Sequence, residues 1–171
     1  IATSATRRPL GVLAFSLPLA SAGGADTVSG KQLPVVYLAR HGETEWTVSG
    51  RHTGRTDLPL TAQGEVEAQR LGQQLQGLTF AAVLTSPLRR AVQTCAAAGF
   101  GPAVEVEPDL VEWDYGDYEG RTSAEIHAER PGWQLFRDGC PGGESPDAVA
   151  ARADRVIRRL RKAGEDMLLF S

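Results

Sequence analysis

The sequence is poor in cysteine, in long apolar runs and in excess charge of either sign. Only Cys95 and Cys140 are present, without a Cys-x-x-C pair, which excludes a disulfide-rich scaffold and offers no zinc-binding spacing. No stretch reaches the roughly 18 to 20 apolar residues of a membrane-spanning helix. With 18 Lys and Arg against 21 Asp and Glu, the chain is no polycation. We therefore predict one globular domain with neither a membrane nor a nucleic-acid partner.

The first part of the chain differs in pattern from the rest. Two arginines near the start precede a weakly apolar run, which is interrupted by proline and glycine, and then a stretch of small residues. This order of positive, apolar and small residues is typical of a secretory leader. We predict a leader or a disordered tail over residues 1–34 and the folded domain over 35–171. A cytoplasmic location is expected, with export as the alternative if residues 1–25 are a signal peptide.

From residue 35 onward, short apolar runs alternate with amphipathic segments. The runs predict strands at 35–39, 80–85, 103–107 and 166–170. Residues that favour helix N-termini predict helices beginning at Thr61, Ser86, Thr122 and Ser145. Alternating strands and helices indicate an α/β fold, with three α/β/α layers around a mostly parallel sheet. In such folds the functional site lies beyond the carboxyl ends of the strands.

The last predicted helix is amphipathic. Its apolar residues are Val149, Ala153, Val156 and Leu160. Arginines gather on the opposite side, at positions 152, 155, 158, 159 and 161. Because aspartates are interspersed among them, we interpret this side as a solvated helix face and not as a docking surface for an acidic partner.

Two predicted strands end in residues suited to an anionic substrate. Arg40, His41 and Gly42 follow the first strand. A neutral imidazole is a competent nucleophile, and its ordinary pKa of about 6.5 keeps much of it neutral at pH 7. Arg89 and Arg90 lie about one turn into the helix that Ser86 opens after the second strand, and the helix N-terminus itself attracts anions. Both ends therefore favour a phosphate group, which an arginine fork can hold.

Several ordered motifs carry a resemblance to a known family. They are LARHGET at 38–44, GRHTG at 50–54, DLPLT at 57–61, SPLRRA at 86–91, EWDYGDYEG at 112–120 and GES at 143–145. Together they resemble the histidine phosphatase superfamily, also called phosphoglycerate-mutase-like, over about 35–171. The segments 112–120 and 133–145 are most similar to the fungal sedoheptulose-1,7-bisphosphatase branch. The resemblance implies hydrolysis of small phosphorylated metabolites, such as sugar phosphates, with no metal and no cofactor.

The resemblance also implies a role for each residue that matches the family's motifs. His41 is expected to attack phosphorus and form a phosphohistidine, which water then hydrolyses. Arg40 and Arg90 are expected to hold the phosphoryl oxygens and to stabilise the transition-state charge. Glu112 matches the proton donor to the leaving alkoxide. The residues expected to contact the substrate are Thr53, Gly54, Tyr115 and Thr47, the last of which replaces a frequent Asn and offers one donor instead of two.

The end of the chain departs from the family pattern. The family follows the strand at 166–170 with a second His-Gly, whose histidine completes the phosphate pocket, whereas this sequence ends at Ser171. We therefore expect a fold that is incomplete at the C-terminus. Either the chain is truncated before the second catalytic histidine, or it lacks part of the site.

Two other functions remain open. A mutase would return the phosphate to the substrate. The mutase branch carries an arginine doublet and a lysine after the proton donor, whereas the arginines of this chain between 118 and 145 are dispersed and no lysine accompanies them. A non-catalytic protein that binds a phosphorylated ligand is the other alternative. The expected partner is a small phosphorylated molecule, and the sequence leaves open whether copies form a homo-oligomer.

Overall fold

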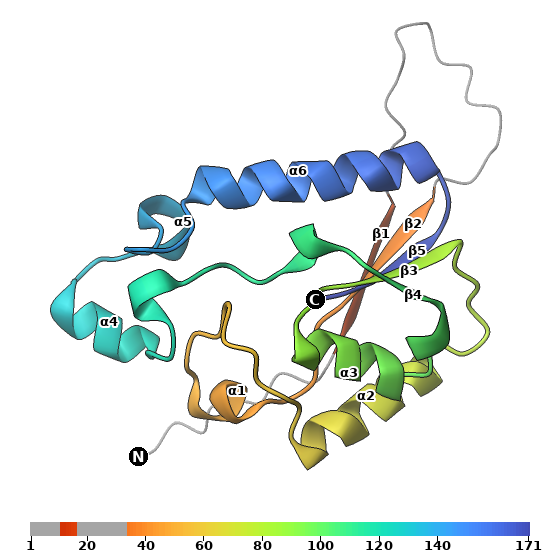
Figure 1. Cartoon of the computed structure of the whole chain (residues 1–171), viewed down its shortest axis with the longest axis horizontal. Helices are drawn as coiled ribbons and strands as arrows, with labels where there is room; N and C mark the ends of the chain where they lie inside the picture. Colours follow the sequence, from red (N-terminus) through yellow and green to blue (C-terminus); the bar gives the residue numbers. More distant parts are fainter. Residues whose placement is uncertain (1–10, 17–33) are drawn as a thin grey trace, which may run out of the picture.

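The computed structural model describes residues 11–16 and 34–171 and contains one five-stranded mixed sheet (Figure 1). The strands are β1 (Val12–Ser16), β2 (Val35–Ala39), β3 (Ala82–Thr85), β4 (Val104–Val106) and β5 (Met167–Phe170). Their order across the sheet is β1-β2-β5-β3-β4. The last four in this order run parallel, and β1 is antiparallel to β2. The predicted mostly parallel sheet is confirmed, with β3 and β4 shorter than the sequence indicated.

Helices cover both faces of the sheet, as Figure 1 shows. The α-helices are α1 (Glu45–Ser49), α2 (Ala62–Gln74), α3 (Arg89–Ala97), α4 (Ser123–Glu129), α5 (Leu135–Asp138) and α6 (Pro146–Ala163). Short 3₁₀ helices lie at η1 (Gly101–Ala103), η2 (Pro108–Leu110) and η3 (Gly116–Tyr118). Helices α2 and α3 pack on one face and α6 on the other, which gives the predicted three layers.

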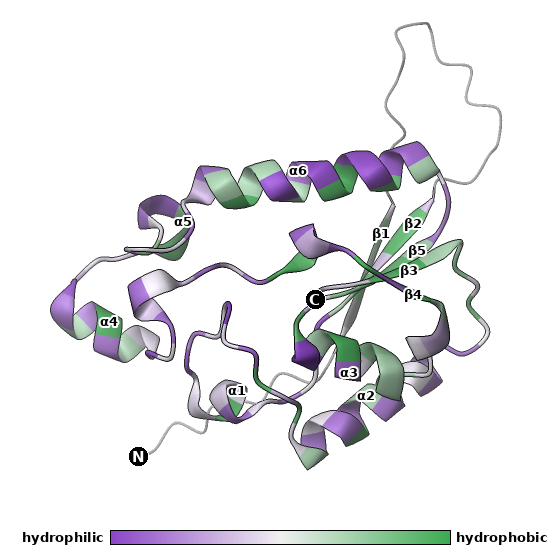
Figure 2. Ribbon diagram, viewed as in Figure 1, coloured by the Kyte–Doolittle hydropathy of each residue, from purple (hydrophilic) through white to green (hydrophobic). Residues whose placement is uncertain are grey.

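The strand β5 joins the two halves of the core. Its residues are all buried, and alternate side chains point to opposite faces of the sheet. Leu168 packs with apolar residues of α2 and α3, whereas Leu169 packs with Val156 and Leu160 of α6. Figure 2 shows the matching pattern, with hydrophobic residues in the central strands and mixed bands on α6. Each fully buried side chain of this size contributes about 1.5–3 kcal/mol.

Local capping signals account for three of the helix starts. Thr61, Thr122 and Ser145 cap α2, α4 and α6 as predicted. Each side chain accepts a hydrogen bond from the backbone N–H three residues further on, which satisfies one otherwise unpaired donor. At α4 the reciprocal bond from the Thr122 backbone to Glu125 completes a capping box.

The start of α3 differs from the prediction. Ser86 does not cap this helix, which begins later, at Arg89. The backbone N–H of Arg89 instead donates to Asp57 Oδ1 at 2.7 Å, so a carboxylate distant in the sequence fills the helix N-terminus. One N–H group at the start of α3 is therefore already satisfied by a carboxylate of the chain.

The strand β1 lies in the segment for which we predicted a leader or a disordered tail. It pairs with β2 from Val12 opposite Ala39 to Ser16 opposite Val35. This pairing satisfies the backbone groups on the side of β2 that faces away from β5, which would otherwise form an exposed edge. Residues 12–16 are therefore part of the sheet and not a disordered tail. The rest of the predicted leader lies outside the described residues.

The arginine-rich side of α6 is not the solvated face that the sequence indicated. Arg152 is only 9% exposed. Arg155 and Arg159 form ion pairs with acidic residues of β4 and the η2 segment. Of the five arginines on this side of the helix, only Arg158 and Arg161 are exposed and form no ion pair with another described residue. The prediction failed because the acidic partners come from a distant segment that packs along the helix.

Candidate active site

Three strand ends meet at one edge of the sheet. In the parallel register, Phe170 of β5 lies opposite Ala39 of β2 and opposite the last residue of β3. The pairing extends beyond the strands, because His41 N donates to Ser171 O at 2.7 Å and Ser86 N donates to Phe170 O at 2.9 Å. The residues that follow β2 and β3 are thus held side by side, as the sequence predicts.

His41 is buried at this edge and only 7% exposed. Its Nδ1 lies 2.8 Å from the carbonyl oxygen of Gly42. Because a carbonyl only accepts, Nδ1 carries the hydrogen and Nε2 keeps its lone pair. The pKa of His41 is lowered to about 4, chiefly by burial; the Gly42 hydrogen bond opposes this shift, and the charges of Arg90 and Arg40 add to it. The ring is therefore neutral at pH 7, as a nucleophile must be.

Arg90 is almost completely buried beside this histidine, at 1% exposure. Its guanidinium donates to three carbonyl oxygens of the loop between α1 and α2, those of Thr53 (3.1 Å), Gly54 (2.9 Å) and Thr56 (3.0 Å). Burial lowers the pKa of Arg90, while nearby acidic groups, Glu112 first among them, raise it. The side chain therefore supplies a fixed positive charge and also holds the loop in place.

Thr94 connects Arg90 to the histidine loop and was not predicted from the sequence. Its hydroxyl accepts from Gly42 N at 2.9 Å and donates to Arg90 O at 2.6 Å. The one signal available is its position four residues after Arg90, on the same face of α3. A threonine on a helix that bonds back to the preceding turn is common, so the sequence alone does not single it out.

Glu119 is a second residue that the sequence analysis missed. Its Oε1 accepts from the backbone N–H groups of Gly54 (2.7 Å) and Thr56 (3.0 Å). Its other oxygen, Oε2, is buried and has no hydrogen-bond partner among the described residues. The loop whose carbonyls bind Arg90 is thus held at its N–H groups by a carboxylate.

Glu112 and Tyr115 lie close to His52, which belongs to this same loop. The His52 and Tyr115 rings are 4.6 Å apart, centroid to centroid, and Tyr115 is buried. Burial lowers the pKa values of His52 and Arg90 and raises that of Tyr115, and in each case the charge of Glu112 is the next influence and raises the pKa. Glu112 therefore lies close to all three groups. Its own side chain is exposed, and its Oε1 accepts from Trp113 N at 2.8 Å.

Arg40 and Thr47 differ in their freedom to contact a ligand. Arg40 is exposed, its charge reaches His41 and Tyr115, and among the described residues its guanidinium makes no hydrogen bond or ion pair. The Thr47 hydroxyl donates to Thr44 O and accepts from Thr44 N, both at 2.8 Å, within the first turn of α1. Thr47 would have to break this local bond before it donated to a substrate.

Within the described ranges, 11–16 and 34–171, no three His, Cys, Asp or Glu side chains gather in a way that could hold a metal ion. In the same part of the chain, no helix is both long and apolar enough to cross a membrane. The arrangement at the strand ends combines a neutral imidazole, two cationic arginines and an exposed carboxyl group. These are the groups that transfer of a phosphoryl group to an imidazole requires.

Comparisons with known proteins agree with this chemistry. The model of the histidine phosphatase superfamily (branch 1) matches residues 36–171. The chain is 44% identical over 124 residues to an acid phosphatase of Mycobacterium tuberculosis, covering 71% of this chain and 61% of that protein. It is 37% identical over 155 residues to the sedoheptulose 1,7-bisphosphatase of Saccharomyces cerevisiae, covering 75% and 56%. A Salmonella choleraesuis relative, named as a probable phosphoglycerate mutase, is 37% identical over 130 residues, covering 71% and 60%.

A solved structure shows the same arrangement of the chain. The structure of the open reading frame Rv3214 from Mycobacterium tuberculosis matches with a TM-score of 0.75 and 40% identity, covering 80% of this chain and 72% of that one. The chain spans 56–61% of the length of the three curated relatives.

Gly54 is expected to tolerate no side chain. A Cβ at this position would overlap the carbonyl oxygen of Trp113 and lie 2.8 Å from Glu119 Oε2. We expect Gly54→Ala to lower the free energy of unfolding by about 1–3 kcal/mol, measured by denaturant titration, because backbone on both sides must move. Gly101→Ala is the matched control, since its Cβ would lie 3.4 Å from Ala96 in ordinary contact. Equal stability of the two variants would contradict this packing.

Proposed function

The chain belongs to the histidine phosphatase superfamily (branch 1), and from that premise we propose that it hydrolyses phosphomonoesters of small metabolites through a phosphohistidine on His41. The observation that carries the proposal is the state of this histidine. It is buried, its pKa is lowered to about 4, and its Nδ1 hydrogen is engaged by Gly42. Only Nε2 is therefore left to attack phosphorus, and it is unprotonated at neutral pH.

The proposed reaction has two steps. In the first, His41 Nε2 forms a bond to phosphorus while the bond from phosphorus to the substrate oxygen breaks, and Glu112 donates a proton to the departing alkoxide. In the second, water attacks the phosphohistidine and gives a proton to the Glu112 carboxylate, inorganic phosphate leaves and His41 is regenerated. The Gly42 carbonyl stabilises the positive charge of the phosphorylated ring through the Nδ1 hydrogen.

Arg90 and Arg40 would both donate hydrogen bonds to the phosphoryl group, with different numbers of free donors. Three hydrogen bonds from Arg90 to loop carbonyls use part of the five donors of a guanidinium, and the remaining donors and the fixed charge are available to phosphoryl oxygens. Arg40 has its full set of donors, since no described residue engages it. Charge that develops on the phosphoryl oxygens thus meets positive charge that is already in place.

Observations near the proton donor favour a phosphatase over a mutase. A mutase on a bisphosphorylated intermediate must hold a second charged group beside the first. In the segment that follows Glu112, Arg121 forms an ion pair with Glu129 at 2.6 Å, and Arg137 forms one with Asp138 at 2.8 Å. These arginines are thus engaged within the chain. Because one relative is named as a probable mutase, mutase activity is the alternative outcome of the test. It would convert the substrate into an isomer without release of inorganic phosphate.

The substrate contacts remain part of the proposal. Thr53 and Gly54 lie in the loop that Arg90 binds, and Tyr115 is buried against His52. We propose that a small phosphorylated molecule is the partner of this site. The near balance of 18 basic and 21 acidic residues gives no support for a nucleic-acid partner.

We expect His41→Ala to abolish release of inorganic phosphate from sugar phosphates, by more than about 10³-fold in kcat, because the nucleophile is lost. The wild-type protein should acquire a covalent phosphate on His41 when it is quenched during turnover, and it should not lose activity on chelation. His127→Ala is the matched control, because the His127 ring bonds Trp133 O at 2.9 Å and takes no part in the proposed chemistry. Full activity of His41→Ala would contradict the proposal.

The protonation of His41 gives a second test. Its folded-state pKa of about 4 lies below the ordinary value of 6.5, so the neutral ring contributes stability fully above pH 6.5, and this contribution is lost as the pH falls toward 4. We expect ¹⁵N NMR titration of the free protein to show a neutral His41 ring with Nδ1 protonated down to about pH 4. A ring that becomes protonated near pH 6.5 would show that burial does not control it.

We expect Glu112→Gln to slow the hydrolysis of sugar phosphates far more than the hydrolysis of p-nitrophenyl phosphate. An alkoxide needs a proton as it leaves, whereas nitrophenolate departs without one, and general acid catalysis is worth roughly 10²- to 10⁴-fold. The measurement is kcat/KM for both substrates, which reports the steps up to departure of the leaving group. Asp117→Asn provides a control, because Asp117 is an exposed carboxyl group on the same segment. Equal slowing of both substrates would show that Glu112 is not the leaving-group acid.

A further inference from the structure

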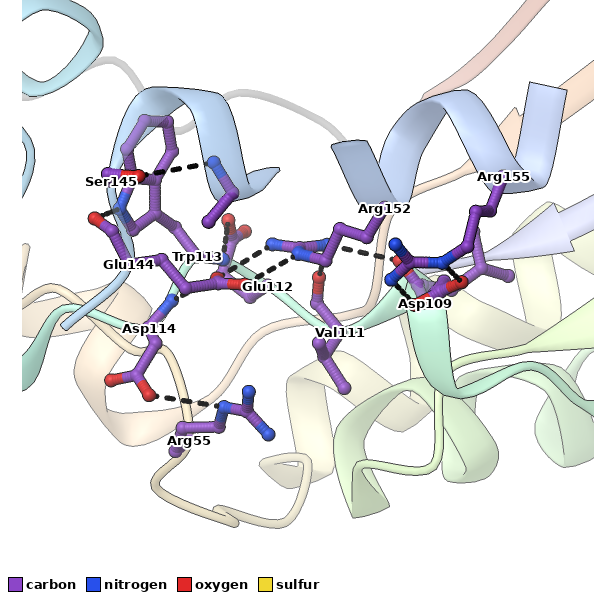
Figure 3. Close-up of polar contacts among 12 residues, drawn as sticks. Arg55, Asp109, Val111, Glu112, Trp113, Asp114, Glu144, Ser145, Arg152 and Arg155 are labelled. Atoms are coloured by element: carbon purple, nitrogen blue, oxygen red, sulfur yellow. Dashed lines mark hydrogen bonds and ion pairs between the residues drawn. The ribbon is translucent and has the colours of Figure 1, made fainter. Parts of the chain in front are cut away.

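The long helix α6 reaches the segment that carries Glu112 through one buried arginine. Arg152 donates from Nε to Glu144 Oε1 at 2.9 Å and from Nη2 to Glu144 Oε2 at 3.1 Å (Figure 3). Its third nitrogen, Nη1, donates to the carbonyl oxygens of Asp109 (3.0 Å) and Val111 (2.6 Å). One guanidinium thus binds a carboxylate with two nitrogens and the backbone just before Glu112 with the third.

Glu144 holds the backbone on the other side of Glu112. Its Oε2 accepts a hydrogen bond from Asp114 N at 2.9 Å. Its backbone N–H donates to Asp114 O at 2.9 Å, and its carbonyl oxygen accepts from Trp113 Nε1 at 3.0 Å. Burial would raise the pKa of Glu144, but the hydrogen bonds from Arg152 and Asp114 hold it below its ordinary value. The Glu144 carboxyl group is therefore ionised. Together, the two side chains bind the backbone before and after Glu112, as the dashed lines in Figure 3 show.

Glu112 itself has little else to fix it. Its side chain is exposed, and among residues 11–16 and 34–171 its carboxyl group makes one hydrogen bond, which Oε1 accepts from the N–H of the next residue, Trp113. The direction of its carboxyl group is thus set by the backbone on which it stands. A buried ion pair adds little net stability, because desolvation of the charges offsets their attraction, so its main effect here is on geometry.

We propose that Arg152 and Glu144 form a positioning pair that aims the Glu112 carboxyl group at the leaving oxygen of the substrate. This inference rests on the proposed function and goes beyond it, because neither residue touches the reacting atoms. Arg152 binds the Glu144 carboxylate with a planar fork and two backbone carbonyls with its third nitrogen, an arrangement that a lysine of equal charge cannot reproduce. A displacement of about 1 Å at a reacting group is enough to cost roughly 10²-fold in rate.

The neighbouring arginine of α6 supplies the control. Arg155 also binds the η2 segment, through Asp109 Oδ1 at 2.6 Å and Oδ2 at 2.7 Å. Its side chain is 54% exposed, however, and it bonds to a side chain and not to the backbone beside Glu112. An exposed ion pair of this kind contributes little to the stability of the fold. Arg155→Lys therefore removes an equivalent guanidinium fork from the same helix without disturbing the hydrogen bonds of Arg152 and Glu144 to the backbone around Glu112.

The test compares Arg152→Lys with Arg155→Lys in the full-length protein, using kcat/KM for a sugar phosphate and for p-nitrophenyl phosphate. We expect Arg152→Lys to lower the sugar phosphate value by roughly 10- to 10²-fold and the nitrophenyl value by less than about threefold. Arg155→Lys should leave both unchanged. In a Glu112→Gln background, Arg152→Lys should cause no further selective loss, because there is no acid left to position.

The ratio of the two kcat/KM values is independent of how much of a variant is folded, so a destabilised preparation still gives an answer. Glu144→Gln provides a second variant, and the same change in ratio is expected. An unchanged ratio in both variants, or an equal change in Arg155→Lys, would overturn the positioning role. If Glu112→Gln shows the selective loss and Arg152→Lys does not, only this inference fails. If the wild-type protein hydrolyses neither substrate, the proposed function fails as well.

Discussion

The strand β5 pairs with β2 on one side and β3 on the other, and the register of these pairings aligns Ala39, Phe170 and Thr85 at one edge of the sheet. Because the strands run parallel, the residues that follow each of them are delivered to the same place. The bond from His41 N to Ser171 O extends the ladder beyond the strands, so the sheet and not a loop positions the histidine. A slip of one residue would turn every side chain of β5 to the opposite face, and the buried packing on both faces opposes that slip.

Two oppositely charged pairs shape the rest of the site in the same way. Arg90 binds the carbonyl oxygens of the loop between α1 and α2, and Glu119 binds the N–H groups of that loop. Arg152 binds carbonyl oxygens before Glu112, and Glu144 binds an N–H group after it. In both cases a buried guanidinium and a carboxylate satisfy irregular backbone that has no strand or helix partner. Side chains thereby replace the hydrogen-bond partners that a strand or helix would give the loops of the candidate site.

What the sequence predicts well depends on neighbours a few positions away. The cap at Thr61 and the apolar strands are local signals, and the structure confirms them. The cap that Asp57 provides to α3 and the burial of Arg152 depend on segments distant along the chain, so sequence patterns predicted them wrongly. The groups proposed to react, such as His41 and Glu112, were selected from sequence motifs. Thr94 and Glu119 did not, because each acts through hydrogen bonds to backbone, and any threonine on a helix or glutamate in a loop is a candidate for such bonds.

In the proposed reaction, the arginines near His41 influence both the protonation of its ring and the binding of the substrate. Burial makes the largest contribution to its lowered pKa, and the charges of Arg90 and Arg40 add to it. In the proposed reaction these same charges would attract a phosphate dianion, so the groups that keep the imidazole neutral would also favour binding of the substrate. Once a phosphoryl group is bound, its negative charge offsets the arginines and favours the positive ring that forms on attack. The Gly42 carbonyl, already bonded to Nδ1, then stabilises that ring without any rearrangement. In the proposed reaction the imidazole is therefore already neutral when the substrate binds, and the charge that develops during transfer would meet groups already in place.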